Sequence, residues 1–287
     1  MTTTKFQEYA ADFEACRQII KHASKSFYAA FSQLPEEEAL SVYAVYAFCR
    51  QADDLIDENQ DLAGLDAFEE QLRAFEDGQV PDQFIWRALA VVFQHYPMNF
   101  QPFYDMIEGQ RMDIAFSQPE TQDDLSHYAY HVAGTVGLML LPILSNQPDT
   151  CVSYARDIGE AMQVTNILRD IGEDRQKGRI YLPSDRMNSF GVSKKDLDQE
   201  MPTKNLILLW ENQAKHAENL YARGLGIIPL VKAEARLALL SAIYYYRAIL
   251  DACRQSDYQV LSKRQSISAF EKAKLLVTVK ADLKKYS

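Results

Sequence analysis

Apolar residues recur at every third or fourth position along most of the 287-residue chain, and we find no run of strict alternation bounded by hairpin turns. This period matches the 3.6 residues per turn of an α-helix, whereas side chains of a strand alternate with a period of two. We predict helices over residues 5–23, 36–57, 65–76, 82–95, 100–116, 122–144, 149–175, 204–224, 233–255 and 267–284. The pattern therefore predicts an all-α fold.

Turn-forming residues fall between these segments, for example Pro35, Pro97, Pro119 and the polar stretch 176–202. No linker rich in Ser, Gly and Pro divides the chain, so we expect residues 1–287 to form a single domain. Hydrophobic residues make up 47% of the sequence, against only 11 Gly and 10 Pro, so a large core is available with few turns.

The net charge of −10 and the absence of a dense Lys/Arg cluster argue against nucleic acid as a partner. The N-terminal segment MTTTKFQEYAADFEAC lacks the pattern of a secretory signal, and the apolar run 132–144 is too short to span a bilayer. Four cysteines, at positions 16, 49, 151 and 253, form no C-x-x-C pair, as is typical of reduced thiols. We expect a soluble cytoplasmic protein and leave peripheral membrane contact and oligomeric state open.

The segment YAFCRQADDLID at 46–57 places charge on a helix that must also pack. Residues three and four apart share a helical face, so Tyr46, Arg50, Asp53 and Asp57 form one stripe. Two carboxylates four positions apart on a helix repel each other by roughly a few tenths of a kcal/mol even in water. Such a stripe is either a solvated face or a site that binds something positive.

A second stripe of the same kind lies in EAMQVTNILRDIGEDR at 160–175. There Gln163, Asn166, Asp170 and Asp174 follow one another at spacings of three, four and four, and Arg169 precedes the first aspartate. Carboxylate and amide oxygens suit Mg²⁺, which takes one or two protein carboxylates and completes its shell with water and phosphate. Two facing stripes could clamp Mg²⁺ and a diphosphate, with arginines on the phosphate oxygens; salt-bridge networks between helices are the structural alternative.

Four motifs in order resemble the squalene/phytoene synthase family: SKSF at 24–27, YAxCRxxDDxxD at 46–57, YHVAGTVG at 130–137 and QVTNILRDIGEDRxxGRIYLP at 163–183. The resemblance covers residues 24–274, and the compact length and SKSF are most similar to the bacterial synthases that make dehydrosqualene (4,4'-diapophytoene). It implies an all-α isoprenoid synthase fold of the class I terpenoid type, with a central cavity and two or three Mg²⁺ ions between the acidic helices.

The resemblance also implies roles for single residues. Metal ligands would be Asp53, Asp57, Asn166, Asp170 and Asp174. Around the diphosphates would lie Ser24, Lys25, Arg50, Gln163, Arg169, Tyr246 and Arg264. Tyr46 and Tyr128 would face the reacting carbons, and Arg50 and Arg169 would act with them in catalysis. We expect apolar walls for the isoprenoid tails from Phe27, Phe31, Tyr43, Val132 and Leu138.

The implied reaction is head-to-head coupling of two farnesyl diphosphates through presqualene diphosphate to dehydrosqualene, in carotenoid biosynthesis and without NADPH. A phytoene synthase acting on geranylgeranyl diphosphate and a squalene synthase using NADPH stay open as alternatives. A head-to-tail prenyltransferase should carry a second D-D-x-x-D, but this chain has DIGED. A di-iron bundle needs Glu-x-x-His pairs, which the sequence lacks. The alternative without catalysis is a helical interaction module.

Overall fold

The computed structural model describes residues 4–57 and 60–286, and for Asp57 it describes the backbone alone. Its α-helices are α1 Lys5–Glu8, α2 Ala10–Ala23, α3 Lys25–Phe31, α4 Glu36–Asp57, α5 Leu62–Glu76, α6 Phe84–His95, α7 Gln101–Ile114, α8 Gln122–Ala129, α9 Thr135–Leu144, α10 Pro148–Gln176, α11 Ser184–Ser189, α12 Lys204–Gly224, α13 Ala233–Gln255 and α14 Ala269–Leu283. No strand occurs in these residues, so the all-α prediction is confirmed.

The predicted boundaries differ from the structure where short local signals start or interrupt a helix. Ser24 ends α2 and begins α3, because its hydroxyl accepts a hydrogen bond from the Phe27 N–H at 3.4 Å. The predicted helix 122–144 is divided by a π-helical turn, Tyr130–Gly134. Helices α3 and α11 were not predicted, since neither is long enough to show helical periodicity.

The π-helical turn packs against α10 with backbone touching backbone. A Cβ added at Gly159 of α10 would lie 2.6 Å from the Cα of Gly134, closer than real Cβ atoms come. A Cβ at Gly137 would lie 3.0 Å from the Ala155 carbonyl oxygen. Gly134 and Gly137 of the AGTVG segment therefore permit close approach between helices.

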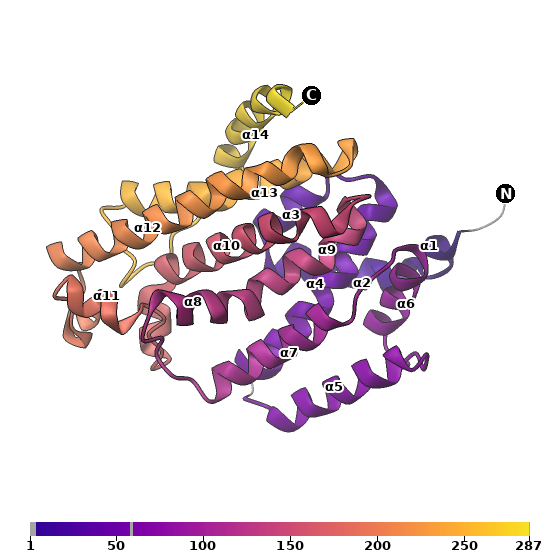
Figure 1. Ribbon diagram of the computed structural model, residues 1–287, viewed down its shortest axis with the longest axis horizontal. Coiled ribbons are helices and arrows are strands. Elements are labelled where there is room, and N and C mark those ends of the chain that lie inside the picture. Colours follow the sequence, from indigo (N-terminus) through magenta and orange to yellow (C-terminus); the bar gives the residue numbers. More distant parts are fainter. Residues whose placement is uncertain (1–3, 58–59, 287) are drawn as a thin grey trace.

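The two acidic helices are held from behind by other helices, α4 by α5, α6 and α7 and α10 by α12, and Figure 1 shows how these helices are arranged. Phe48, on the back of α4, is fully buried and contacts Phe68 of α5, Trp86 of α6 and Phe103 of α7 at ring-centroid distances of 4.9–5.7 Å. On the back of α10, the Trp210 Nε1–H of α12 donates to the Leu168 carbonyl oxygen at 3.0 Å. Packing behind each helix leaves its acidic stripe facing the interior between them.

Candidate active site

The acidic stripes of α4 and α10 face one cavity of about 420 Å³. Thirteen of the residues predicted for the site line it: Ser24, Tyr46, Arg50, Asp53, Tyr128, Val132, Gln163, Asn166, Arg169, Asp170, Asp174, Tyr246 and Arg264. They come from the four helices α4, α8, α10 and α13, from the π-helical turn, from the junction of α2 and α3, and from the loop after α13. The Asp57 side chain lies outside the described residues, so its predicted role as a metal ligand stays a prediction.

Arginines lie against the carboxylates within this cavity. Arg50 contacts Asp53, with 2.9 Å between Nη1 and Oδ2, and also contacts Asp54 one position further on. Arg169 donates from Nε to Oδ1 of Asp170 at 2.7 Å. Ion pairs are thus present, but they line a cavity, where an incoming anion could take over the guanidinium groups from the carboxylates.

Arg264 reaches the second stripe because a glycine admits the loop that carries it. A Cβ at Gly172 of α10 would lie only 2.0 Å from the Leu261 carbonyl oxygen, so another side chain would push the loop away. The Gly172 N–H donates to the Val260 carbonyl oxygen at 3.0 Å. With the loop held there, Arg264 Nε lies 3.2 Å from Oδ1 of Asp170.

Two oxygen-bearing side chains of the second stripe, Asn166 and Asp174, are partly buried without enough hydrogen-bond donors or positive charge around them. A bound cation would supply that positive charge. The Asn166 Oδ1 atom is buried, and no residue of the described chain donates a hydrogen bond to it. Burial and then the nearby Asp170 charge raise the pKa of Asp174 from 3.8 to about 7. A buried amide oxygen without a donor next to a carboxylate that resists ionisation fits a divalent cation.

Among the described side chains, no three His, Cys, Asp or Glu groups stand close enough together to form a complete metal site. The side chain of Asp57 is not part of that set. Magnesium needs few protein ligands when substrate phosphate supplies the others. Asp53, Asn166, Asp170 and Asp174 are therefore the described residues that could hold it.

The cavity wall also contains residues that the sequence analysis did not single out, chiefly Gln110, Asp113, Lys177, Arg179 and Tyr181. Asp113 is 8% exposed and joins two phenols, accepting from the Tyr128 hydroxyl at 3.0 Å and from the Tyr181 hydroxyl at 2.8 Å. The two rings stack with centroids 5.0 Å apart. Burial raises the pKa of Tyr128 well above 10, so this residue stays a phenol.

A second, smaller cavity of about 220 Å³ continues from the first, since both share Tyr46, Val132 and Asn166 on their walls. Its further lining is mainly apolar: Phe27, Cys49, Met106, Ala133, Val136 and Met162. The space between α4 and α10 thus changes from charged at one end to apolar at the other. Such a gradient suits a ligand with an anionic head and an apolar tail.

Four predicted residues line neither of these cavities: Lys25, Phe31, Tyr43 and Leu138. Phe31 follows Phe27 by one turn and lies behind it, with ring centroids 5.1 Å apart. Tyr43 is buried against Tyr28, with centroids 5.9 Å apart. Lys25 is exposed at the start of α3, where its charge adds to burial in lowering the pKa of Lys272. Of the three aromatic residues predicted for the tail wall, Phe27 lines the apolar cavity, Phe31 packs behind it, and Tyr43 lies elsewhere in the core.

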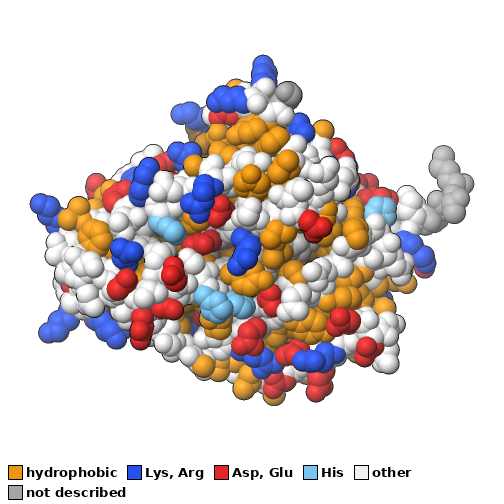
Figure 2. Space-filling model, in the orientation of Figure 1, with side chains coloured by type: hydrophobic (Ala, Val, Ile, Leu, Met, Phe, Trp, Pro, Cys, Tyr) orange, Lys and Arg blue, Asp and Glu red, His pale blue; other side chains and the backbone are white. Residues whose placement is uncertain are grey.

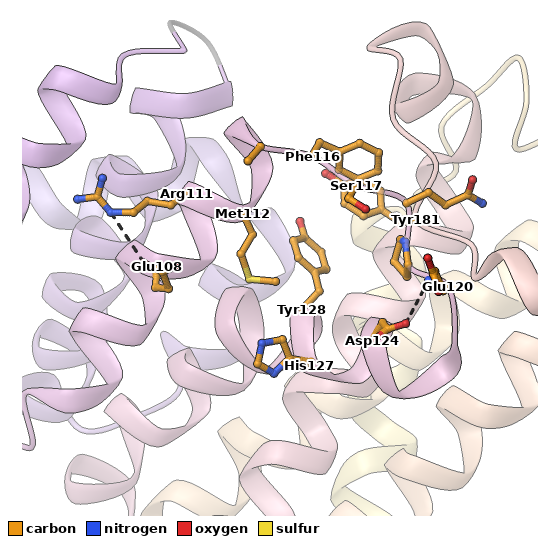
Figure 3. Close-up of a pocket in the computed structure, with 13 residues that line it drawn as sticks. Glu108, Arg111, Met112, Phe116, Ser117, Glu120, Asp124, His127, Tyr128 and Tyr181 are labelled. Atoms are coloured by element: carbon orange, nitrogen blue, oxygen red, sulfur yellow. Dashed lines mark hydrogen bonds and ion pairs between the residues drawn. The ribbon is translucent and has the colours of Figure 1, made fainter.

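A third cavity, of about 650 Å³, lies on the far side of the Tyr128 and Tyr181 rings (Figure 3). Met112 and Phe116 form part of its wall, and Arg111, Asp124 and His127 stand around it. Phe116 contacts the Tyr181 ring at a centroid distance of 5.1 Å. Stacked phenols thus separate this cavity from the charged one.

The fold is that of an all-α isoprenoid synthase, and the relatives of the chain are prenyltransferases. The sequence profile of the squalene/phytoene synthase family matches residues 20–271, so the chain belongs to that family. The resemblance proposed from the four motifs is confirmed.

Individual relatives agree with this placement. The chain is 39% identical over 281 residues to 4,4'-diapophytoene synthase of Staphylococcus haemolyticus, covering 96% of this chain and 97% of that protein. It is 35% identical to 15-cis-phytoene synthase of Synechococcus elongatus, covering 91% and 89%. A crystal structure of a dehydrosqualene synthase with a bound ligand superposes with a TM-score of 0.97 at 51% identity, covering 99% of this chain and 100% of that one.

Proposed function

We propose that this protein, acting as one domain, couples two farnesyl diphosphates head to head through presqualene diphosphate and releases dehydrosqualene. The observation that carries the proposal is the single cavity between α4 and α10, charged at one end and apolar at the other. The identities to a diapophytoene synthase and to a dehydrosqualene synthase structure support the choice of product. Membership of a synthase family argues against a helical interaction module.

The charged end would hold the diphosphate groups. Arg50, Arg169 and Arg264 each present a guanidinium group to the cavity, and a planar fork can grip two phosphate oxygens at once. Asp53, Asn166, Asp170 and Asp174 would hold two or three Mg²⁺ ions, and Asp57 is proposed to complete the first group. When bound, Mg²⁺ would neutralise negative charge on the departing diphosphate.

The aromatic residues would stabilise the carbocations that form during the reaction. The first allylic C–O bond breaks and the diphosphate leaves with the electron pair; the cation adds to the double bond of the second substrate, and loss of a proton closes a cyclopropane ring. The second diphosphate then leaves, and loss of a proton from the rearranged cation gives dehydrosqualene. The Phe27 ring lies 6.0 Å from the Tyr46 ring and 5.6 Å from the Tyr246 ring, measured between centroids. The faces of these three rings can stabilise the positive charge of the carbocations. Asp113 would fix Tyr128 beside them.

Squalene would require a hydride in place of the last proton loss, and hence NADPH, which we propose this protein does not use. Phytoene would require the twenty-carbon geranylgeranyl diphosphate, and the 35% identity to a phytoene synthase keeps this as the second candidate. Incubation with Mg²⁺ and either the fifteen- or the twenty-carbon diphosphate, followed by mass spectrometry of the extracted products, decides among the three. A sole product that contains added hydrogen, formed only with NADPH, would contradict the proposal.

A further inference from the structure

The C-terminal helix α14 presents large apolar side chains to solvent. Phe270 is 80% exposed and Val277 is 71% exposed, more than any other large hydrophobic residue in the described chain. At about 100° per residue they lie roughly 20° apart on one face. The opposite face packs toward α13 and contains the buried Val279. No residue that the structure describes therefore covers the outer apolar stripe.

Lysines flank that stripe. Residues 269–286 contain five lysines and two acidic residues, a net charge of +3, in a chain whose net charge is −10. Both acidic side chains already have partners: Glu271 accepts from the Ser268 N–H at 2.6 Å, and Asp282 pairs with Lys285 at 2.5 Å and accepts from the Tyr244 hydroxyl of α13. The remaining outward lysines, at positions 274, 280 and 284, have no acidic partner within ion-pair distance in the described chain.

The lysines lie on both sides of the apolar stripe around the axis of α14. Lys274 lies about 40° to one side of Phe270 and Lys280 about 80° to the other side, and Lys284 follows directly after α14 as the first residue of the 3-10 turn Lys284–Tyr286. Blue and orange side chains meet at the top of the molecule in Figure 2, where Figure 1 places α14. Lysines on both sides of an apolar stripe can extend their ammonium groups toward lipid phosphates while the stripe contacts the acyl boundary.

We propose that this surface, formed by Phe270, Val277, Lys274, Lys280 and Lys284 and here called the α14 face, docks in the plane of an anionic lipid bilayer. The charge pattern favours lipid over a second copy of the chain, because a two-fold contact would bring the same lysines together. In the described residues no helix is long and apolar enough to cross a membrane, so the contact is peripheral.

In the sequence, the α14 face follows shortly after a residue that lines the charged cavity. Arg264, which lines that cavity and is 52% exposed, is separated from α14 by only residues 265–268. A bilayer on the α14 face would therefore lie near the cavity rim. If the proposed reaction holds, an apolar hydrocarbon could pass from the cavity to lipid over a short path, but docking itself requires no substrate.

The test is vesicle co-sedimentation of the full chain without substrate. Vesicles of phosphatidylcholine with about 30 mol% phosphatidylglycerol should bind the protein, and pure phosphatidylcholine vesicles should bind it far less. Each lysine at the surface contributes about fivefold in partitioning, so Lys274→Gln/Lys280→Gln/Lys284→Gln should lower it on the order of 100-fold. Phe270→Ser/Val277→Ser should lower it at least about tenfold, because the apolar stripe is lost.

Matched controls lie at the far end of the molecule. Lys194→Gln/Lys195→Gln/Lys204→Gln removes the same charge from exposed positions, and Met201→Ser/Leu208→Ser removes exposed apolar side chains. Both should retain most of the parental vesicle binding. Equal losses in the controls and the α14 variants would overturn the assignment of the face, as would parental protein that fails to bind anionic vesicles at low salt.

A spectroscopic arm reports contact directly. The two native tryptophans, Trp86 and Trp210, are buried, so Phe270→Trp adds one exposed reporter. Its emission should shift to the blue on addition of anionic vesicles and return when salt is raised, since screening weakens the attraction. If sedimentation velocity instead shows a dimer that Phe270→Ser/Val277→Ser dissociates, and vesicles cause no shift, the face belongs to a second copy and the lipid proposal is wrong.

Discussion

Replacement of Gly172 by alanine tests the geometry of the site without removing any group proposed to touch the substrate. The added Cβ would lie 2.0 Å from the Leu261 carbonyl oxygen, whereas ordinary contact begins at 3.4 Å. The loop must therefore move away by about 1.4 Å. Because a backbone atom is in the way, a change of rotamer cannot relieve the contact.

The cost to folding should be modest, and activity should fall because Arg264 is displaced. Overpacking typically costs about 1–3 kcal/mol, and alanine in a helix returns up to about 1 kcal/mol relative to glycine. Arg264 moves with the loop, and a misplacement of about 1 Å can cost on the order of 100-fold in rate. We expect Gly172→Ala to remain folded by circular dichroism and to lose about 10- to 100-fold in kcat/KM for the fifteen-carbon diphosphate.

A double-mutant cycle shows whether the loss passes through Arg264. If Gly172→Ala acts by displacing that arginine, then Arg264→Ala should add no more than about threefold to it, although each variant alone is impaired. Gly224→Ala is the control for overpacking, since its Cβ would meet the movable Ile158 side chain at 2.5 Å, away from the site. Parental activity in Gly172→Ala, or fully multiplicative losses in the double variant, would refute this reasoning.

Three further predictions concern charge and chain length. The pKa of Asp174 is raised from 3.8 to about 7, so the stability supplied by the protonated carboxyl is fully present below about pH 3.8 and is lost as the pH rises from there to about 7. Asp174→Asn should therefore raise the melting temperature of the metal-free protein by a few degrees at pH 8 but little at pH 4, while turnover falls by orders of magnitude. Thermal scans at both pH values check this, and equal shifts would contradict it. Arg50→Lys keeps charge but loses the planar fork, so kinetics should show diphosphate use weakened about tenfold or more; unchanged kinetics would exclude bidentate binding. Phe31→Ala removes the support behind Phe27 and should raise the use of the twenty-carbon over the fifteen-carbon diphosphate, with Tyr43→Ala, now placed away from the tail cavity, as the control; an identical preference in the two variants would contradict that placement.

Helical spacing was sufficient to predict the two acidic stripes, because side chains three and four positions apart must share a face. Gln163, Asn166 and Asp170 accordingly line one cavity with Arg50 and Asp53. The spacing within one helix does not show which face of another helix it meets, because that depends on tertiary packing. The sequence alone gave no reason to join Asp113 to Tyr181, which lies 68 positions away.

The positions of Gly172, Phe31 and Tyr43 also depend on tertiary packing that the sequence pattern does not predict. Gly172 stands between Asp170 and Asp174 in DIGED, yet its function depends on a loop from beyond α13. Phe31 and Tyr43 were predicted to form the tail wall from their nearness in sequence to the motifs. The structure buries both in the core: each stands one helical turn away from a residue that lines a cavity, with Phe31 packed against Phe27 and Tyr43 against Tyr28.

The central claim is the reaction, and its most direct test is identification of the product. Purified protein is incubated with farnesyl diphosphate and Mg²⁺, with and without NADPH, and the extracted hydrocarbon is identified by mass spectrometry, with EDTA as the metal-free control. We expect a thirty-carbon product of the mass of dehydrosqualene in both samples and none with EDTA. Squalene formed only with NADPH, or a product formed only from geranylgeranyl diphosphate, would contradict it.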